Sequence, residues 1–347
     1  MWKHFGESIV ITVLGFIAAY FWAEHMHPGS GLASLFIVLV LSVLEVSLSF
    51  DNAVVNAMKL EHMTDKWRHR FLTWGIAIAV FGMRLLFPIL IVALFAKVSM
   101  LTVAKMAVYN ADKYSYYLHE THAPIVAFGG AFLMMLFLHY FFNEKKDVHW
   151  ICSIEELLCR SGNVYGIETV ITLIVISITQ SFVADEHKLG VVLAGVSGVI
   201  LYLVIEGLSK FLEEKEAKRT AKMVGTAVRT GGFVSFMYLE LIDASFSLDG
   251  VLGAFALSKD VIIIAIGLSI GAVFVRSLTI LLVEEGTLKQ FRYLEHGAHW
   301  AIGALAALMF VATFRAVPEV ITGLIGLVFI ISALISSILY NKKHSQQ

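Results

Sequence analysis

The sequence predicts an all-α polytopic membrane protein with about ten transmembrane helices in two inverted five-helix repeats. The first observation behind this prediction is the composition. Of 347 residues, 58% are hydrophobic and 15% are charged, and the mean hydropathy is +0.80. The second is a series of apolar runs of roughly 20 residues, which is the length that crosses a bilayer. The third is an acidic motif that occurs once in each half of the chain.

Ten apolar segments follow one another, with boundaries good to a few residues. The first, 8–22, is predicted to be a helix and not a signal peptide, because residues 24–28 lack a small-residue cleavage site. The other nine segments are 32–58, 71–96, 123–142, 166–183, 189–211, 232–257, 260–283, 297–314 and 318–340.

The orientation follows from the Lys and Arg residues of the connections. Most of them lie at the two termini and in the even-numbered connections. Because positive charge is retained in the cytoplasm, both termini are predicted to be cytoplasmic and the number of spans to be even. The expected location is the inner (plasma) membrane, with the lipid bilayer as a partner.

Matching positions divide the chain into two repeats, 1–188 and 189–347. Gly75 precedes Arg84 by nine residues, and Gly267 precedes Arg276 by the same interval. A shift of five helices is odd, so the two repeats must enter the membrane in opposite directions. Inverted repeats of this kind build transporters whose site lies between the repeats.

Two polar connections are long. A charged linker at about 210–230 joins the first and second helices of the second repeat and is expected to be helical and solvated. It is also a candidate contact for a second copy of the chain or for a membrane-complex partner. Residues 97–122 are rich in aromatics and are expected to cover the membrane interface, although His119 and His122 leave metal binding open.

Composition also excludes some partners. A formal net charge of -1 gives no bulk attraction for nucleic acid, so no nucleic-acid partner is expected. Cys152 and Cys159 have a spacing that fits no common metal motif, and both are expected to be reduced thiols.

The acidic motif reads EVSLSFDNA at residues 45–53 and ELIDASFSLDG at residues 240–250. When the two are aligned, three polar positions coincide: Glu45 with Asp243, Ser49 with Ser247, and Asp51 with Asp249. Acidic groups inside a membrane-spanning segment are costly and usually serve function.

Helical geometry sorts the polar groups of the first motif. At 100° per residue, one stripe carries Ser42, Glu45, Ser49, Asn52 and Asn56.

Asp51 and Asp249 lie about 120° away from Glu45 and Asp243, so a regular helix cannot aim both acids of a motif at one point. Either the helices unwind near 49–52 and 247–250, or the two aspartates pair with the buried Arg84 and Arg276.

The residues left on the stripe under the pairing hypothesis form a site made of oxygen atoms. Glu45, Glu240 and Asp243 supply carboxylates, and Ser49, Ser247 and Asn52 supply neutral oxygens. Oxygen ligands suit Mn²⁺, Ca²⁺ or Mg²⁺, whereas Cu and Zn favour thiolate or imidazole. No resident cofactor is expected beyond the transported ion.

Together, the two motifs resemble the paired signatures of the TerC family of integral membrane proteins. That family is named for tellurium resistance, and its members are associated with Mn²⁺ efflux or with Ca²⁺ and Mn²⁺ supply to secreted enzymes. The resemblance implies ion-site roles for Glu45, Asp51, Asn52, Glu240, Asp243 and Asp249. Ser49, Ser247, Arg84 and Arg276 would support them.

We therefore expect a transporter that exports a divalent cation by alternating access, with Mn²⁺ as the expected ion, and not an enzyme. A carboxylate that binds no metal would carry a proton back. The alternative is a non-transporting membrane scaffold of a metal or tellurite stress-response complex, docked through the linker. An intramembrane enzyme has less support, because the chain has no HExxH or protease motif.

Overall fold

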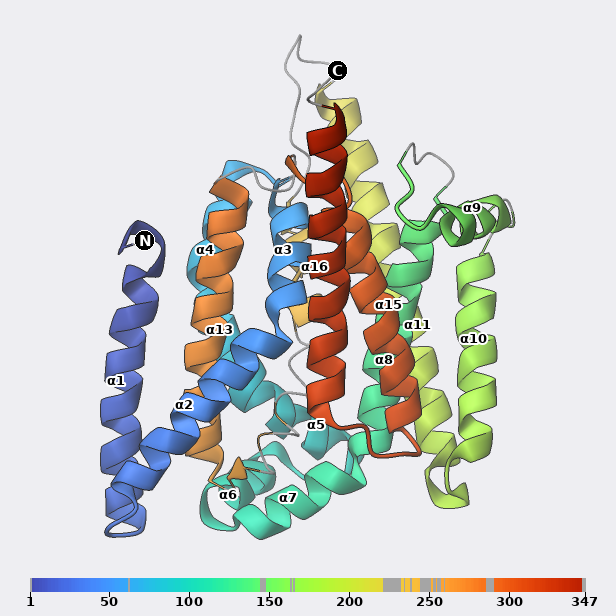
Figure 1. The fold of residues 1–347 in the computed structure, drawn as a ribbon. Helices are drawn as coiled ribbons and strands as arrows, with labels where there is room; N and C mark the ends of the chain where they lie inside the picture. The colour runs from blue at the N-terminus through green and yellow to red at the C-terminus, as the bar shows by residue number, and fades with distance from the viewer. Residues whose placement is uncertain are drawn as a thin grey trace.

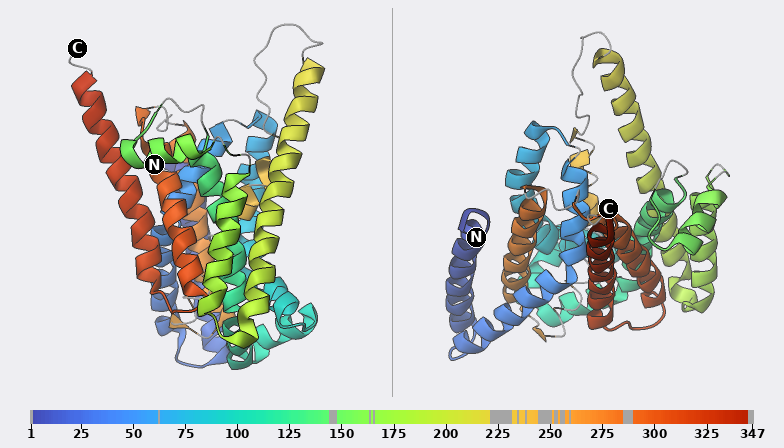
Figure 2. Two further views of the ribbon diagram at one scale, coloured as in Figure 1. Left: turned by 90° about the vertical axis from the view of Figure 1, so that its right-hand side faces the viewer. Right: turned by 45° about the horizontal axis from the view of Figure 1, so that its top comes forward.

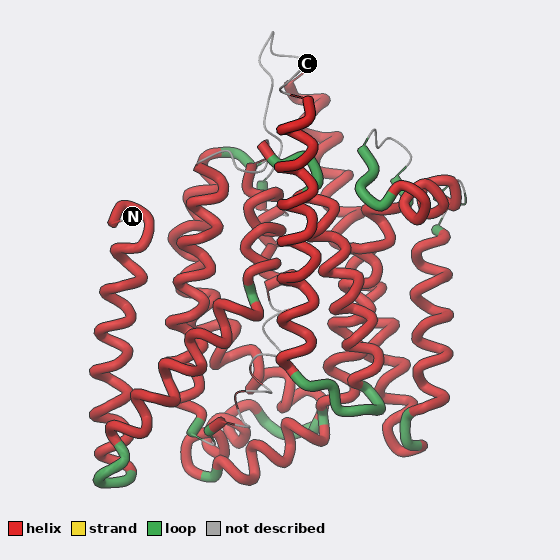
Figure 3. The backbone as a smooth tube through the Cα atoms, in the orientation of Figure 1, coloured by secondary structure: helices red, strands yellow, loops and turns green. Residues whose placement is uncertain are grey.

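The computed structural model consists almost entirely of helices (Figures 1 and 3). It describes residues 2–61, 63–143, 148–162, 164, 166–220, 232, 233, 235–237, 239–243, 251, 254, 257, 258, 260–284 and 290–344. No β-strand forms within these ranges. The predicted all-α class is confirmed.

Seven helices within the described ranges are long and apolar enough to cross a membrane. They are α1 (Trp2–Met26), α2 (Gly31–Leu48), α8 (His122–Phe141), α11 (Asp185–Thr220), α13 (Val261–Glu284), α15 (Leu294–Ala312) and α16 (Glu319–His344). Large apolar side chains such as Phe21, Phe36 and Leu193 face outward on three of them. An exposed apolar surface of this extent belongs in lipid, so the chain is a polytopic membrane protein.

The other three predicted segments have different structures. Segment 71–96 lies within a continuous helical stretch made of α4 (Asp65–Ala77), the π-helix η1 (Ile78–Leu86) and α5 (Phe87–Phe95). Segment 166–183 forms the shorter α10 (Ile167–Thr179) and η2 (Gln180–Phe182). Segment 232–257 is described only in part. The count of ten spans and the inverted repeats therefore stay predictions.

The connection 97–122 folds into α6 (Met100–Tyr109) and α7 (Ala111–Glu120), at the end of the molecule opposite the C-terminus (Figure 1). The side chains of Ser99 and Asn110 cap these helices by accepting backbone N–H groups. Tyr114 is 1% exposed and packs with Val92 and Leu118. Burial raises the pKa of the Tyr114 phenol above its usual value.

The opposite end carries α9 (Cys152–Ser161), which a buried carboxylate fastens to α15. Glu155 Oε1 accepts the indole N–H of Trp300 at 2.9 Å, and Glu155 Oε2 accepts the backbone N–H of Trp150 at 2.9 Å. His149 and His296 lie 3.8 and 3.6 Å from Glu155 Oε2. The carboxylate thus links α9, the residues before it and α15.

The predicted charged linker begins as a continuation of α11, which projects beyond most of the bundle (Figure 2). The helix is described as far as Thr220, and residues 221–231 lie outside the described part of the chain. Both termini lie at the same end of the bundle as this projection. Which side of the membrane this end faces stays a prediction.

Two glycines bring α13 against α2. A Cβ atom at Gly267 would lie 2.6 Å from the Leu41 Cβ, and one at Gly271 would lie 2.5 Å from the Glu45 Cβ. Both distances are too short for a real contact, so only glycine permits this approach. The close packing places α13 directly beside the acidic residue of α2.

Candidate metal-ion site

The first acidic motif lies where a helix breaks. The helix α2 ends at Leu48 and α3 (Phe50–Glu61) begins at Phe50, with Ser49 between them at φ −102° and ψ 16°. Figure 1 shows that α2 is strongly inclined whereas α3 is upright. Ser49 Oγ donates to Glu45 Oε1 at 2.9 Å across the break. The break lies at the first residue of the predicted unwinding over 49–52, whereas residues 50–52 are helical in α3.

The predicted polar stripe is buried along its whole length. Its members are Ser42, Glu45, Ser49, Asn52 and Asn56, and none is more than 7% exposed. The helical periodicity therefore identified the inward face of both α2 and α3. The backbone of Asp51 lies in α3, but its side chain is outside the described part of the structure.

Arg84 joins this stripe to the second motif. Its Nη2 forms an ion pair with Glu45 Oε1, and its Nη1 lies 3.5 Å from Asp243 Oδ2. Asn52 Nδ2 also donates to Asp243 Oδ1. The sequence hypothesis paired the arginines with Asp51 and Asp249. In the structure Arg84 engages Glu45 and Asp243, two acids that the same hypothesis assigned to the ion, whereas the side chains of Asp51 and Asp249 lie outside the described part of the structure.

Arg276 is held differently, although it matches Arg84 in the sequence repeat. Its Nη2 donates to the backbone carbonyl of Phe71, and its Cζ lies 4.1 Å from the Phe71 ring centroid. A cation over an aromatic face is favourable. Arg276 is part of the regular helix α13, whereas Arg84 is part of the π-helix η1.

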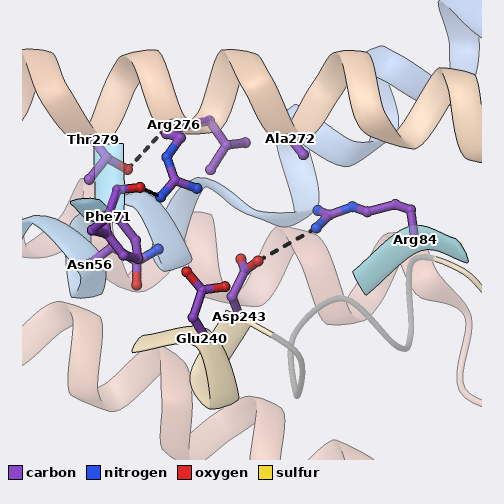
Figure 4. A pocket seen from close by; sticks show the side chains of 9 residues that line it. Asn56, Phe71, Arg84, Glu240, Asp243, Ala272, Arg276 and Thr279 are labelled. Atoms are coloured by element: carbon purple, nitrogen blue, oxygen red, sulfur yellow. Dashed lines mark hydrogen bonds and ion pairs between the residues drawn. The ribbon is translucent and has the colours of Figure 1, made fainter. Parts of the chain in front are cut away.

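A cavity of about 20 Å³ lies among these groups (Figure 4). That volume holds roughly one water molecule or one ion. The side chains around it are Asn56, Phe71, Arg84, Glu240, Asp243, Ala272, Val275, Arg276 and Thr279.

Two oxygen atoms at this cavity lack hydrogen-bond partners within the described structure. They are Glu240 Oε1 and Asn56 Oδ1, and each residue is only 5% exposed. Leaving a buried acceptor unsatisfied costs roughly 1–3 kcal/mol, and more when it is charged. Both atoms are oxygen acceptors of the kind that bind hard cations.

Glycine also shapes this cavity. A Cβ atom at Gly75 of α4 would lie 2.9 Å from Glu240 Oε1 and would overlap the guanidinium of Arg276. Gly75 therefore makes room for both charged groups. The structure thus gives a packing reason for one glycine of the repeated Gly–Arg pair.

Sequence reasoning found most of this site and missed part of it. Ser247 and Asp249 lie outside the described residues. Asn56 belonged to the predicted stripe but was not assigned to the ion, although its position four residues after Asn52 was the available signal. Phe71 carried no signal, because it contributes a ring and a backbone carbonyl.

A second, larger cavity is less suited to a cation. It has a volume of about 720 Å³ and lies at the α7–α8 corner, beside the first turn of α11 and the end of α15. His119, His122, His187 and Arg315 line it, and no carboxylate does. The acidic cluster is therefore the better candidate for a divalent cation.

Comparison with known proteins gives one match. No curated protein and no solved structure matches the chain. One protein-family profile matches residues 50–344, which include α3, η1, the second motif and α13. Since this match covers most of the chain, the protein belongs to the family described as "Protein of unknown function (DUF475)".

Proposed function

We propose that this protein is a membrane transporter that exports a divalent metal cation, with Mn²⁺ as its main substrate. The observation that carries the proposal is the buried pair of unsatisfied oxygens, Glu240 Oε1 and Asn56 Oδ1, at a cavity of single-ion size. Asp243 lines the same cavity, and Glu45 is joined to it through Arg84. A buried acidic cluster inside a membrane bundle is a functional feature by default.

The chemistry of the donor set supports a hard cation. The cavity offers carboxylate, amide and hydroxyl oxygens and neither thiolate nor imidazole. These ligands suit Mn²⁺, Mg²⁺ and Ca²⁺. The resemblance of both acidic motifs to the TerC signatures favours Mn²⁺ among the three.

The position of the site supports transport by alternating access. Its acids come from two segments far apart in the chain, 31–61 and 239–243, and both segments contact Arg84. A break such as that at Ser49 is common in the helices that form transporter sites. In the proposed cycle the ion is shared between the two motifs, and movement of one part of the bundle against the other exposes it to each side.

The test is Mn²⁺ uptake into everted membrane vesicles, with Glu45→Gln and Asp243→Asn as the variants. Both substitutions keep the side-chain shape and remove one negative charge. We expect uptake by the native protein and its loss in each variant at equal protein levels. Unchanged uptake in both variants would contradict the proposal.

A further inference from the structure

The most informative contact of the candidate site is the one that Arg84 makes with Glu45 and Asp243. Arg84 is 4% exposed, and its guanidinium is paired with both carboxylates at once. A cation bound by Glu45 and Asp243 together would have to replace it there. Within the described chain, no three acidic, histidine or cysteine side chains are close enough to hold one metal ion.

The charges of the cluster indicate that Arg84 and a metal ion compete for the same carboxylates. Its described members are three carboxylates, Glu45, Glu240 and Asp243, and two guanidinium groups, Arg84 and Arg276. Arg84 is the positive charge that Glu45 and Asp243 share. If Arg84 leaves, both carboxylates lose that charge, and a divalent cation would replace it.

The reverse step has the same electrostatic requirement. Once the ion has left, the buried Glu45 and the partly buried Asp243 would both lose the positive charge between them. Unpaired buried charges cost several kcal/mol each. Arg84 removes that cost by returning to the two carboxylates, as it does in the structure.

The local backbone gives Arg84 a way to move. Residues Ile78–Leu86 form a π-helix between the α-helices α4 and α5. Short π-helical segments often lie at functional sites. A change of one residue in helical register turns a side chain by about 100° around the axis. Such a change would carry Arg84 from its two carboxylates.

Arg276 serves as the internal comparison. It lies in the unbroken α-helix α13 and is fixed by the carbonyl and ring of Phe71. It has no ion pair among the described residues. Although it lines the cavity, it is held by Phe71, whereas Arg84 is held by the two carboxylates themselves.

We propose that Arg84 is a built-in substitute cation: it occupies the acidic site when no metal is bound, and the metal must displace it. This inference rests on the proposed transport function. It concerns the step in which the protein returns to its starting conformation without a bound metal ion. With Arg84 in the site, the protein returns without a second cation. Without it, the empty site keeps its full negative charge and the protein can return only with a metal ion bound.

The experiment measures two modes of transport with full-length protein in proteoliposomes. Net uptake is the entry of Mn²⁺ into vesicles that contain none, and it requires the empty return step. Exchange is the entry of radioactive Mn²⁺ into vesicles already filled with unlabelled Mn²⁺, and it does not. Native protein, Arg84→Gln, Arg84→Lys and Arg276→Gln are compared.

For Arg84→Gln we expect net uptake to fall at least tenfold while exchange is kept, together with tighter Mn²⁺ binding. Arg84→Lys should restore part of the net uptake, because it keeps the positive charge. Arg276→Gln should change net uptake and exchange by the same factor, so that their ratio stays native. The ratio of net uptake to exchange is the decisive value, since a merely structural role would lower both equally.

Three results would overturn the proposal. They are equal loss of both modes in Arg84→Gln, native net uptake in Arg84→Gln, and an equal change of the ratio in Arg276→Gln. If Arg84→Gln does not fold, Arg84→Lys decides: the substitute cation predicts that net uptake falls by a larger factor than exchange, and an equal fractional loss of both modes contradicts it. Failure of the transport function itself looks different: the native protein would then show neither mode.

Discussion

The Nη1 atom of Arg84 lies 3.5 Å from Asp243 Oδ2, and the same guanidinium holds Glu45. Through this contact an arginine of the π-helix η1 joins acids from both motifs. Neither motif forms the cluster alone, so the site depends on the packing between distant parts of the chain. The substitutions of Gly75, Gly271, Asn56 and Glu240 discussed below each alter part of that packing or its chemistry, and Glu155→Ala tests a separate contact.

Replacing Gly75 by alanine should weaken cation binding. The new Cβ would overlap the Arg276 guanidinium and lie 2.9 Å from Glu240 Oε1, so both charged groups must move. We expect the Mn²⁺ affinity to fall about tenfold, equivalent to roughly 1.4 kcal/mol. The control is Gly207→Ala, because no atom lies within 4 Å of its Cβ position. Equal affinities in the two variants would refute the steric argument.

Gly271→Ala should destabilise the whole bundle. Its Cβ would lie 2.5 Å from the Glu45 Cβ and 2.8 Å from the Ser42 carbonyl oxygen, so α13 must move away from α2. Overpacking of this kind typically costs 1–3 kcal/mol. Thermal unfolding in detergent should show a lower Tm than that of the native protein. A native Tm would mean that the two helices are less tightly packed than described.

Asn56→His should change the selectivity of the site. Asn56 Oδ1 is one of the unsatisfied oxygens at the cavity, and an imidazole there would add the ligand that Zn²⁺ favours. The ratio of Zn²⁺ affinity to Mn²⁺ affinity should therefore rise. Asn56→Asp adds charge but only oxygen, and it should strengthen binding of both ions. An unchanged ratio in Asn56→His would show that Asn56 does not touch the ion.

Glu155→Ala should loosen α9 and leave the acidic cluster intact. The substitution removes the acceptor for the Trp300 indole and the Trp150 backbone N–H. Loss of such buried bonds costs about 1–3 kcal/mol. Limited proteolysis should cut residues 148–162 faster than in Glu156→Ala, which changes an exposed neighbour. Equal cleavage rates, or an altered Mn²⁺ affinity, would contradict the assigned structural role.

The sequence predicted the parts of the site that depend on a single helix. The stripe that contains Glu45, Ser49 and Asn52 follows from the fixed rotation of 100° per residue. The buried Arg84 and Arg276 followed from charges inside apolar runs. Membrane class and helix content followed from composition in the same way.

The partners of the arginines could not be predicted from the sequence. Whether Arg84 meets Asp51 or Glu45 depends on how η1, α2 and the second motif pack, and local periodicity contains no such information. The π-helix itself has no sequence signal that separates it from an α-helix. Gly75 and Gly271 likewise acquire a reason only when the atoms opposite them are known.

Direct Mn²⁺ binding to the purified protein, measured by titration calorimetry, tests the central claim most directly. The native protein should bind Mn²⁺, and Glu240→Gln should lower the affinity at least about tenfold, because it removes a charged and otherwise unsatisfied ligand. Glu156→Gln, an exposed control, should bind as the native protein does. Native affinity in Glu240→Gln, or no binding by the native protein, would contradict a metal site in the acidic cluster.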